Sequence, residues 1–222
     1  IVTGCSGYVG NFLIKQLKKK YLVISIDLVD SIFTDIKSNI SDLDLEKKIG
    51  NEEVTIINLA SVKQDHNIKA SECYKFNVQD HQNFLNKIEN VNCTRFIHIS
   101  SVAALDGEDI KFNESLDPDN SYRSTKYMQG KIIKNWCKIK KIKFAEVLPS
   151  AIFDDKPRKF TNIGKLQFFA SHLPFIPKIE VKKSLTSMRK LISFIEYLLE
   201  KKDLNGSFLA IEDPINSVSE II

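Results

Sequence analysis

The sequence lacks the long apolar runs and the paired cysteines that mark two large classes of protein. No apolar run approaches the roughly 18 residues that a membrane-spanning helix needs, so we expect no membrane span. The chain has only four cysteines, Cys5, Cys73, Cys93 and Cys137, without paired spacing. This argues against a disulfide framework or a zinc site and favours reduced thiols in a cytoplasmic protein.

The sequence also lacks a large net charge and a cluster of histidines. The net charge of +4 is too small to predict a nucleic-acid partner. Basic residues gather between Lys131 and Lys143, and we interpret them as a solvated helix face. The four histidines, at positions 66, 81, 98 and 172, have no metal-ligand spacing. We therefore predict no metal and interpret the histidines as surface or strand residues.

Three glycines near the start predict a phosphate-binding turn. Gly4, Gly7 and Gly10 follow a short apolar run and precede a helical pattern at residues 11–20. Such a turn leaves backbone N–H groups at a helix N-terminus, where partial positive charge favours a pyrophosphate. In this spacing the first glycine permits the turn, the second admits the diphosphate and the third allows close helix packing.

An acidic residue about twenty positions further on specifies the cofactor. Residues 21–26 have the pattern of a buried strand, and Asp27 follows them directly. A carboxylate there can accept hydrogen bonds from the adenosine ribose and would repel a 2′-phosphate. Because Leu28 follows and no arginine is placed to bind that phosphate, we predict NAD rather than NADP.

Short strand patterns alternate with helical patterns along the chain. The expected strands beyond the second cover residues 31–37, 54–59, 95–99, 142–148 and 206–211. The expected helices beyond the first cover residues 43–50, 70–90, 122–139, 163–171 and 187–201. This alternation predicts an α/β fold with a Rossmann-type, doubly wound parallel sheet. We divide the chain into an NAD-binding domain, 1–150, and a small, incomplete substrate lobe, 151–222, with segments returning to the sheet.

A tyrosine and a lysine four residues apart predict an acid–base site. Tyr122 and Lys126 share one face of an expected helix, and a nearby ammonium lowers the pKa of a phenol. Such a tyrosine is a usable acid–base group for a secondary alcohol, and the lysine can hold the cofactor ribose. Ser101, at a strand end, could orient the substrate oxygen. An overlapping pair, Tyr127 and Lys131, points to a different face of the helix.

Six segments carry a family resemblance: residues 3–10, 39–42, 58–61, 77–78, 98–105 and 113–122. Together they resemble the extended short-chain dehydrogenases/reductases, in the NAD-dependent epimerase/dehydratase branch that acts on nucleotide sugars. The match selects Tyr122 and Lys126 over the overlapping pair. It is specific up to about residue 150 and weaker beyond, where the chain most resembles bacterial polysaccharide epimerases and 4-keto reductases.

The resemblance implies site residues. The catalytic residues would be Ser101, Tyr122 and Lys126. Contacts to NAD would come from Gly4, Ser6, Gly7, Tyr8, Val9, Gly10, Asp27, Asn39, Ile40, Leu59, Ala60, Ser61, Asn77, Ile99, Tyr122, Lys126, Pro149, Ala151 and Ile152. Contacts to substrate would come from Ser101, Val102, Tyr122 and Lys183, the last of which replaces a diphosphate-binding arginine of the family.

The activity implied is that of an NAD-dependent nucleotide-sugar epimerase similar to UDP-hexose 4-epimerases. Tyr122 would remove a hydroxyl proton while hydride passes to NAD, and a transient keto-sugar would rotate before hydride returns. Two alternatives stay open: an NAD(P)H-dependent 4-keto-sugar reductase and a non-catalytic dinucleotide-binding protein. The helices at 70–90 and 122–139 resemble those of the family's dimer, so we expect a homodimer with a UDP-sugar substrate.

Overall fold

A seven-stranded sheet of order β10-β6-β5-β4-β1-β2-β3 forms the centre of the protein, and every neighbouring pair is parallel. The computed structural model describes residues 1–64, 67–154, 164–165, 168, 172, 182–212 and 216–217. The strands of the sheet are β1 (Val2–Thr3), β2 (Ser25–Asp27), β3 (Ile36–Lys37), β4 (Val54–Asn58), β5 (Cys93–Ile99), β6 (Lys143–Pro149) and β10 (Asn205–Ala210). The predicted doubly wound parallel sheet is confirmed.

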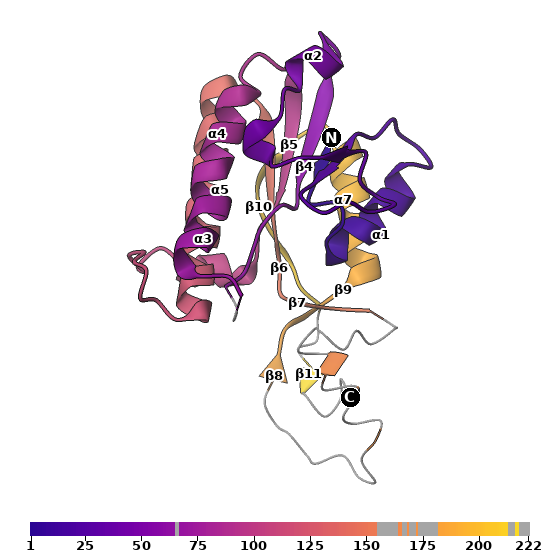
Figure 1. Ribbon diagram of the computed structural model, residues 1–222. Helices are drawn as coiled ribbons and strands as arrows, with labels where there is room; N and C mark the ends of the chain where they lie inside the picture. The colour runs from indigo at the N-terminus through magenta and orange to yellow at the C-terminus, as the bar shows by residue number, and fades with distance from the viewer. Residues whose placement is uncertain are drawn as a thin grey trace.

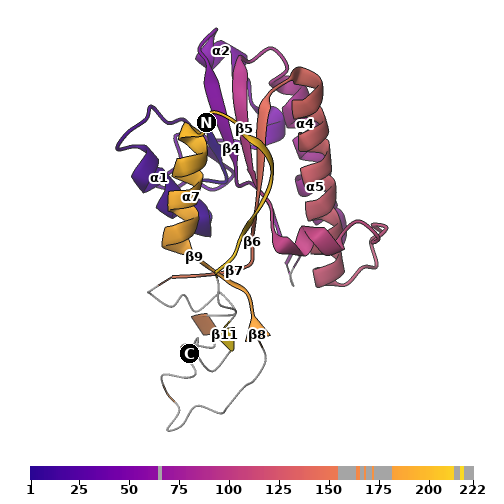
Figure 2. The same ribbon diagram turned by 180° about the vertical axis from the view of Figure 1, so that it is seen from behind.

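Helices cover both faces of the sheet (Figure 1). One face carries α1 (Tyr8–Leu17) and α7 (Met188–Glu200), and the other carries α3 (Ala70–Tyr74), α4 (Asp80–Lys87) and α5 (Pro118–Lys140). Figure 2 shows the same three layers from behind. Successive strand residues alternate between the faces, so Ile57 and Ile97 pack toward α1 and α7, whereas Ile56 and Phe96 pack toward α4 and α5.

Helix α5 begins earlier than the sequence pattern predicts. The Asp117 side chain accepts hydrogen bonds from the Asp119 and Asn120 N–H groups, and Pro118 occupies the first turn. Both features are typical of a helix start, because they satisfy or remove donors that lack a partner inside the helix. The predicted start at Tyr122 is therefore one turn late, and that tyrosine lies inside the helix.

Four other predicted elements differ from the structure. The strand expected at 21–26 is wrong in its first half: Leu22 is 98% exposed, and the Tyr21 N–H instead closes the end of α1 on the Leu17 carbonyl. The strand expected at 31–37 shortens to β3. The helix expected at 43–50 shortens to α2 (Glu46–Ile49), which follows a 3-10 turn, η1 (Ile40–Asp42). The helix expected at 70–90 contains a π-helical turn, η2 (Lys75–Gln79).

Beyond residue 150 the chain supplies both an edge strand of the sheet and small pairs of strands beside it. Strand β10 pairs with β6, β7 (Ala151–Phe153) pairs in parallel with β9 (Leu185–Ser187), and β8 (Lys182–Lys183) pairs antiparallel with β11 (Asn216–Ser217). Figure 1 shows β8 and β11 beyond one end of the main sheet. Most of the helix expected at 163–171 lies outside the described residues. Among those residues no helix is long and apolar enough to cross a membrane.

Candidate active site

The glycine-rich turn between β1 and α1 tolerates no larger residue at its first and third positions. Gly4 has φ +75°, and a Cβ there would lie 2.7 Å from the Ala60 backbone nitrogen. A Cβ on Gly10 would lie 2.3 Å from the Gly4 carbonyl oxygen. Helix α1 has no side-chain cap and no acidic residue in its first turn. The turn therefore offers close backbone approach and uncapped helix N–H groups, which fit a diphosphate.

The carboxylate of Asp27 lies beside this turn at the end of β2. Its Oδ2 atom accepts a hydrogen bond from the Ser6 N–H at 2.9 Å, and its Oδ1 atom accepts one from the Val29 N–H at 3.0 Å. The two bonds join the glycine-rich turn to the loop that follows β2. This arrangement holds a negative charge where the second strand of a dinucleotide-binding fold meets its ligand.

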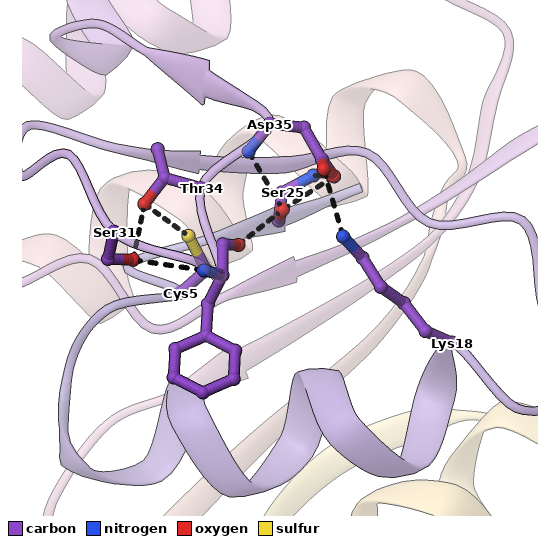
Figure 3. A network of polar contacts seen from close by, with 7 residues as sticks. Cys5, Lys18, Ser25, Ser31, Thr34 and Asp35 are labelled. Carbon is purple, nitrogen blue, oxygen red and sulfur yellow. Dashed lines mark hydrogen bonds and ion pairs between the residues drawn. The ribbon is translucent and has the colours of Figure 1, made fainter.

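A side-chain network fixes that loop against the turn and α1 (Figure 3). The buried Cys5 thiol lies 3.6 Å from the Thr34 hydroxyl. Asp35 accepts hydrogen bonds from the Ser25 backbone and hydroxyl and from Lys18 Nζ at 2.9 Å. Burial raises the pKa of the Cys5 thiol, so this thiol stays protonated and serves as a small packing group.

A pocket of about 190 Å³ opens between the turn, β2 and the end of β4. Nine residues predicted to contact the cofactor line it: Gly4, Ser6, Gly7, Asp27, Asn39, Ile40, Leu59, Ala60 and Ser61. The sequence analysis missed six more lining residues, Ile26, Leu28, Ser38, Val62, Phe76 and His81. Five of them adjoin predicted positions along the chain, Phe76 next to Asn77 included, and this adjacency is the signal that could have found them. His81 on α4 adjoins none of these positions.

Other predicted cofactor residues lie outside this pocket. Tyr8, Val9 and Gly10 form the first turn of α1, Ile99 and Pro149 end β5 and β6, and Ala151 and Ile152 belong to β7. Asn77 is fully buried, where its amide donates to the Val62 carbonyl and the Thr125 hydroxyl. The backbone of Lys183 lies in β8, but its side chain is outside what the structure describes.

The structure brings Ser101 and Tyr122 together. Ser101 caps the 3-10 turn η3 (Val102–Asp106), where its Oγ atom accepts a hydrogen bond from the Ala103 N–H at 3.2 Å. Its side chain also lies close enough to the Tyr122 phenol to lower the pKa of that phenol. The predicted substrate residue Val102 begins the same turn. A hydroxyl pair of this kind at the carboxyl edge of the sheet can hold one substrate oxygen between two groups.

Lys126 is buried one turn further along α5, but it does not bond Tyr122. Its Nζ atom donates to the Ile99 carbonyl at 3.2 Å and to Gln129 Oε1 at 2.6 Å. Burial lowers the pKa of Lys126 to about 7, partly offset by the negative charge of Glu146. Burial also raises the pKa of Tyr122, partly offset by the nearby Ser101 side chain. The predicted lowering of the Tyr122 pKa is therefore wrong for this structure, because the lysine is bonded elsewhere.

A buried polar network behind Lys126 was missed. His81 on α4 is buried, so the predicted surface position is wrong for this residue. His98 is a strand residue in β5, as predicted, and His66 lies outside the described residues. Burial lowers the pKa of His81 to about 4 and that of His98 well below its usual range. Asn58 at the end of β4 lies between the two rings, 3.2 Å from His98 Nδ1 and 3.3 Å from His81 Nε2. Nothing in the local sequence signals this convergence.

A parallel sheet with a glycine-rich turn after β1 and an acid at the end of β2 defines a dinucleotide-binding protein. The sequence profile of the NAD dependent epimerase/dehydratase family matches residues 1–167, and the chain belongs to this family. It is therefore an enzyme with NAD as its cofactor.

Solved structures share the fold. The chain superposes on UDP-glucuronic acid 4-epimerase from Bacillus cereus, in complex with NAD, with a TM-score of 0.77, 17% identity and coverage of 100% of this chain and 79% of that one. For UDP-glucose 4-epimerase from Thermotoga maritima, with UDP-glucose, the TM-score is 0.77, the identity 16% and the coverage 99% and 79%. A comparison with curated proteins found no significant sequence match.

Proposed function

We propose that the protein is a nucleotide-sugar 4-epimerase that acts on a UDP-hexose. The observation that carries the proposal is the proximity of the Ser101 side chain to the Tyr122 phenol, with Lys126 buried on the same helix at the carboxyl edge of β5. Similarity to solved 4-epimerases, crystallised with NAD or with UDP-sugars, supports the substrate class. The division into a cofactor domain, 1–150, and a substrate lobe, 151–222, is part of this proposal.

The residues lining the nucleotide pocket fit NAD. The glycine-rich turn would receive the diphosphate, because Gly4, Ser6 and Gly7 line the pocket and the N-terminus of α1 has no side-chain cap. Asp27 would hold the adenosine ribose, and Asn39 and Ile40 would border the adenine. When bound, NAD accepts a hydride from the sugar carbon and later returns it. The remaining chemistry, the binding and the movement of protons, falls to the side chains of this chain.

Tyr122 would take the proton of the sugar hydroxyl and return it after the keto-sugar has rotated in the site. Ser101 would hold the same oxygen through its Oγ atom, since the Ser101 side chain lies near the phenol. To act as a base at neutral pH, Tyr122 needs a lower pKa than burial alone gives it. In this structure Lys126 bonds Gln129 and the Ile99 carbonyl, so its proposed role is to hold the cofactor ribose, and any positive charge it adds acts on the phenol without a direct bond.

To test the proposal, the NAD-loaded protein is incubated with a panel of UDP-sugars without added NADH. We expect interconversion of two 4-epimers without net change in NADH absorbance. Tyr122→Phe should abolish turnover while NAD stays bound. Tyr127→Phe is the matched control, since Tyr127 lies on the same helix but bonds Glu108 at 2.8 Å and is expected to retain activity.

Three outcomes would redirect the assignment. NADH oxidation with a 4-keto sugar, without epimerisation, would indicate a reductase. Unchanged turnover in Tyr122→Phe would contradict the role of the tyrosine. Bound NAD without turnover of any sugar would favour a non-catalytic dinucleotide-binding protein.

We also propose that the protein is a homodimer through the layer of α3, α4 and α5. These helices pack side by side along one face of the sheet (Figures 1 and 2). Light scattering coupled to size exclusion would give twice the 25.4 kDa chain mass. A monomer at all concentrations tested would contradict the proposal.

A further inference from the structure

We propose that Gln129, held in place by His81, is a positioning residue that fixes the amino group of Lys126. The inference rests on the role proposed above for Lys126, but its evidence is a chain of hydrogen bonds that links three secondary-structure elements.

The first link is the bond between Lys126 and Gln129. Both side chains are fully buried on α5, three residues apart and therefore on one face of the helix. Lys126 Nζ donates to Gln129 Oε1 at 2.6 Å and, less closely, to the Ile99 carbonyl at 3.2 Å. Gln129 is thus the nearest acceptor that the structure gives to this buried amino group.

The second link sets the orientation of the Gln129 amide. Its Nε2 atom donates to the Ala60 carbonyl at 2.9 Å and lies 2.8 Å from His81 Nε2. Two oxygens that can only accept lie beside the His81 ring, the Phe76 carbonyl at 2.8 Å from Nδ1 and Asn58 Oδ1 at 3.3 Å from Nε2. We assign the proton to Nδ1 because its contact is the shorter, which leaves Nε2 of the neutral ring as an acceptor for the Gln129 amide. With both neighbours of the amide nitrogen accepting, the amide oxygen must face Lys126.

The third link joins this series of hydrogen bonds to the cofactor pocket. Ala60, Phe76 and His81 all line the pocket that opens at the glycine-rich turn. Gln129 therefore connects the wall of the nucleotide pocket to Lys126. The arrangement places the lysine amino group by fixed bonds rather than by chance packing of a flexible chain.

The bond also changes how readily Lys126 holds its proton. An acceptor favours the charged form of an amine, whereas burial disfavours it and here lowers the Lys126 pKa to about 7. The other ionisable groups that face Lys126 are His81 from α4, His98 from β5 and Glu146 from β6. Loss of the Gln129 acceptor should therefore lower the Lys126 pKa further.

The first test needs no substrate. Urea unfolding of the whole chain at pH values between 5.5 and 10, roughly the span from the folded to the unfolded pKa of a buried lysine, reports the proton that Lys126 loses on folding. Buried histidines add a rise in stability below about pH 6.5, and the buried thiols, whose pKa is raised, add a fall above about pH 8.5. The Lys126 contribution is therefore taken as the difference in stability between each variant and the same chain carrying Lys126→Met. In the otherwise unmodified chain, that difference should rise with pH above about 7. In Gln129→Met, which has similar volume but no acceptor, the rise should begin about one pH unit lower.

Controls separate positioning from a merely structural role. Ile133→Val alters a buried residue one turn along α5 and should lower stability without moving the onset of the rise. His81→Leu keeps Gln129 but removes the acceptor that orients its amide, so it should move the onset in the same direction as Gln129→Met. If Gln129→Met fails to fold, the onset of the stability rise in His81→Leu becomes the test of the proposal. An onset that stays in place in the deciding variant would overturn the proposal.

The second test uses the NAD-loaded enzyme with its UDP-sugar. Gln129→Met should lower kcat about tenfold, with little change in KM and with the rate–pH profile shifted like the onset of the stability rise. Ile133→Val should leave both unchanged. An unaltered kcat and pH profile in Gln129→Met would overturn the positioning role. If the stability shift appears but the unmodified enzyme turns over no sugar, the proposed function fails and the hold of Gln129 on Lys126 stands.

Discussion

The Ser6 N–H donates to Asp27 Oδ2 at 2.9 Å across a separation of 21 residues. The glycine-rich turn and the end of β2 are therefore joined directly, and the carboxylate is held before any ligand arrives. A group already oriented for a ribose loses little freedom on binding, which strengthens its discrimination between ligands.

Asp27→Asn tests this discrimination. The substitution keeps the shape of the side chain and its ability to accept from Ser6, but removes the negative charge. We expect NAD to bind roughly tenfold more weakly and the preference for NAD over NADP to narrow, because hydrogen bonds to a charged group contribute about 1.5–3 kcal/mol. Fluorescence titration with both cofactors measures the effect. The exposed Asp30→Asn is the control, and an unaltered preference would contradict the prediction.

Gly10→Ala tests the close packing of α1. The new Cβ would lie 2.3 Å from the Gly4 carbonyl oxygen, so the helix must shift away from the turn. We expect a loss of more than about 2 kcal/mol in the free energy of unfolding, together with loss of NAD binding. Gly50→Ala is the comparison: Gly50 has φ +60° and ψ −131°, with no atom within 4 Å of an added Cβ. Its replacement should cost about 1–3 kcal/mol through backbone strain alone and leave NAD binding intact. Equal effects of the two substitutions on NAD binding would refute this account of the turn.

The buried histidines predict the acid stability. Burial lowers the pKa of His81 to about 4, so between pH 6.5 and about 4 the unfolded chain binds a proton that the folded chain refuses. The His81 contribution to the free energy of unfolding should be fully present above pH 6.5 and fall by about 3 kcal/mol as the pH drops through this window. His98 should add a further loss. Thermal melts between pH 7 and 4.5 measure it. His81→Leu should flatten the slope, whereas His172→Gln, at an exposed position, should not.

The cysteines predict low thiol reactivity. All four are buried, and burial raises the pKa of Cys5 and Cys137 and brings that of Cys93 to about 12. Because the thiolate is the reactive form, a disulfide reagent such as DTNB should label almost none in the native protein and all four in guanidinium chloride. Rapid labelling of a native thiol would show that the turn around Cys5 or the core opens readily.

Short-range spacing is sufficient to predict the glycine-rich turn and Asp27, whereas the choice of Tyr122 over Tyr127 also needs the family resemblance. Each depends on strands ending at one edge of a parallel sheet, and that edge follows from the alternation of strands and helices. The strand expected at 21–26 fails because its first half lies outside the sheet, where Leu22 is 98% exposed. An apolar run does not reveal whether a neighbouring strand covers it.

The network around Lys126 could not be predicted for a different reason. His81 and Gln129 come from α4 and α5, and they meet only after the π-helical turn η2 has set the direction of α4. A glutamine inside a helix has no motif value of its own. Its partner is 48 residues away, so only the assembled fold shows the contact.

Strand β10 has a consequence for synthesis of the chain. It pairs with β6 along six residues, Asn205 to Ala210, and is the last strand to join the main sheet in chain order. During translation β6 therefore waits with its outer hydrogen-bonding edge unpaired while more than fifty further residues are made. Unpaired strand edges invite association with other chains, so the nascent protein is most exposed to aggregation, and to chaperone binding, in this interval.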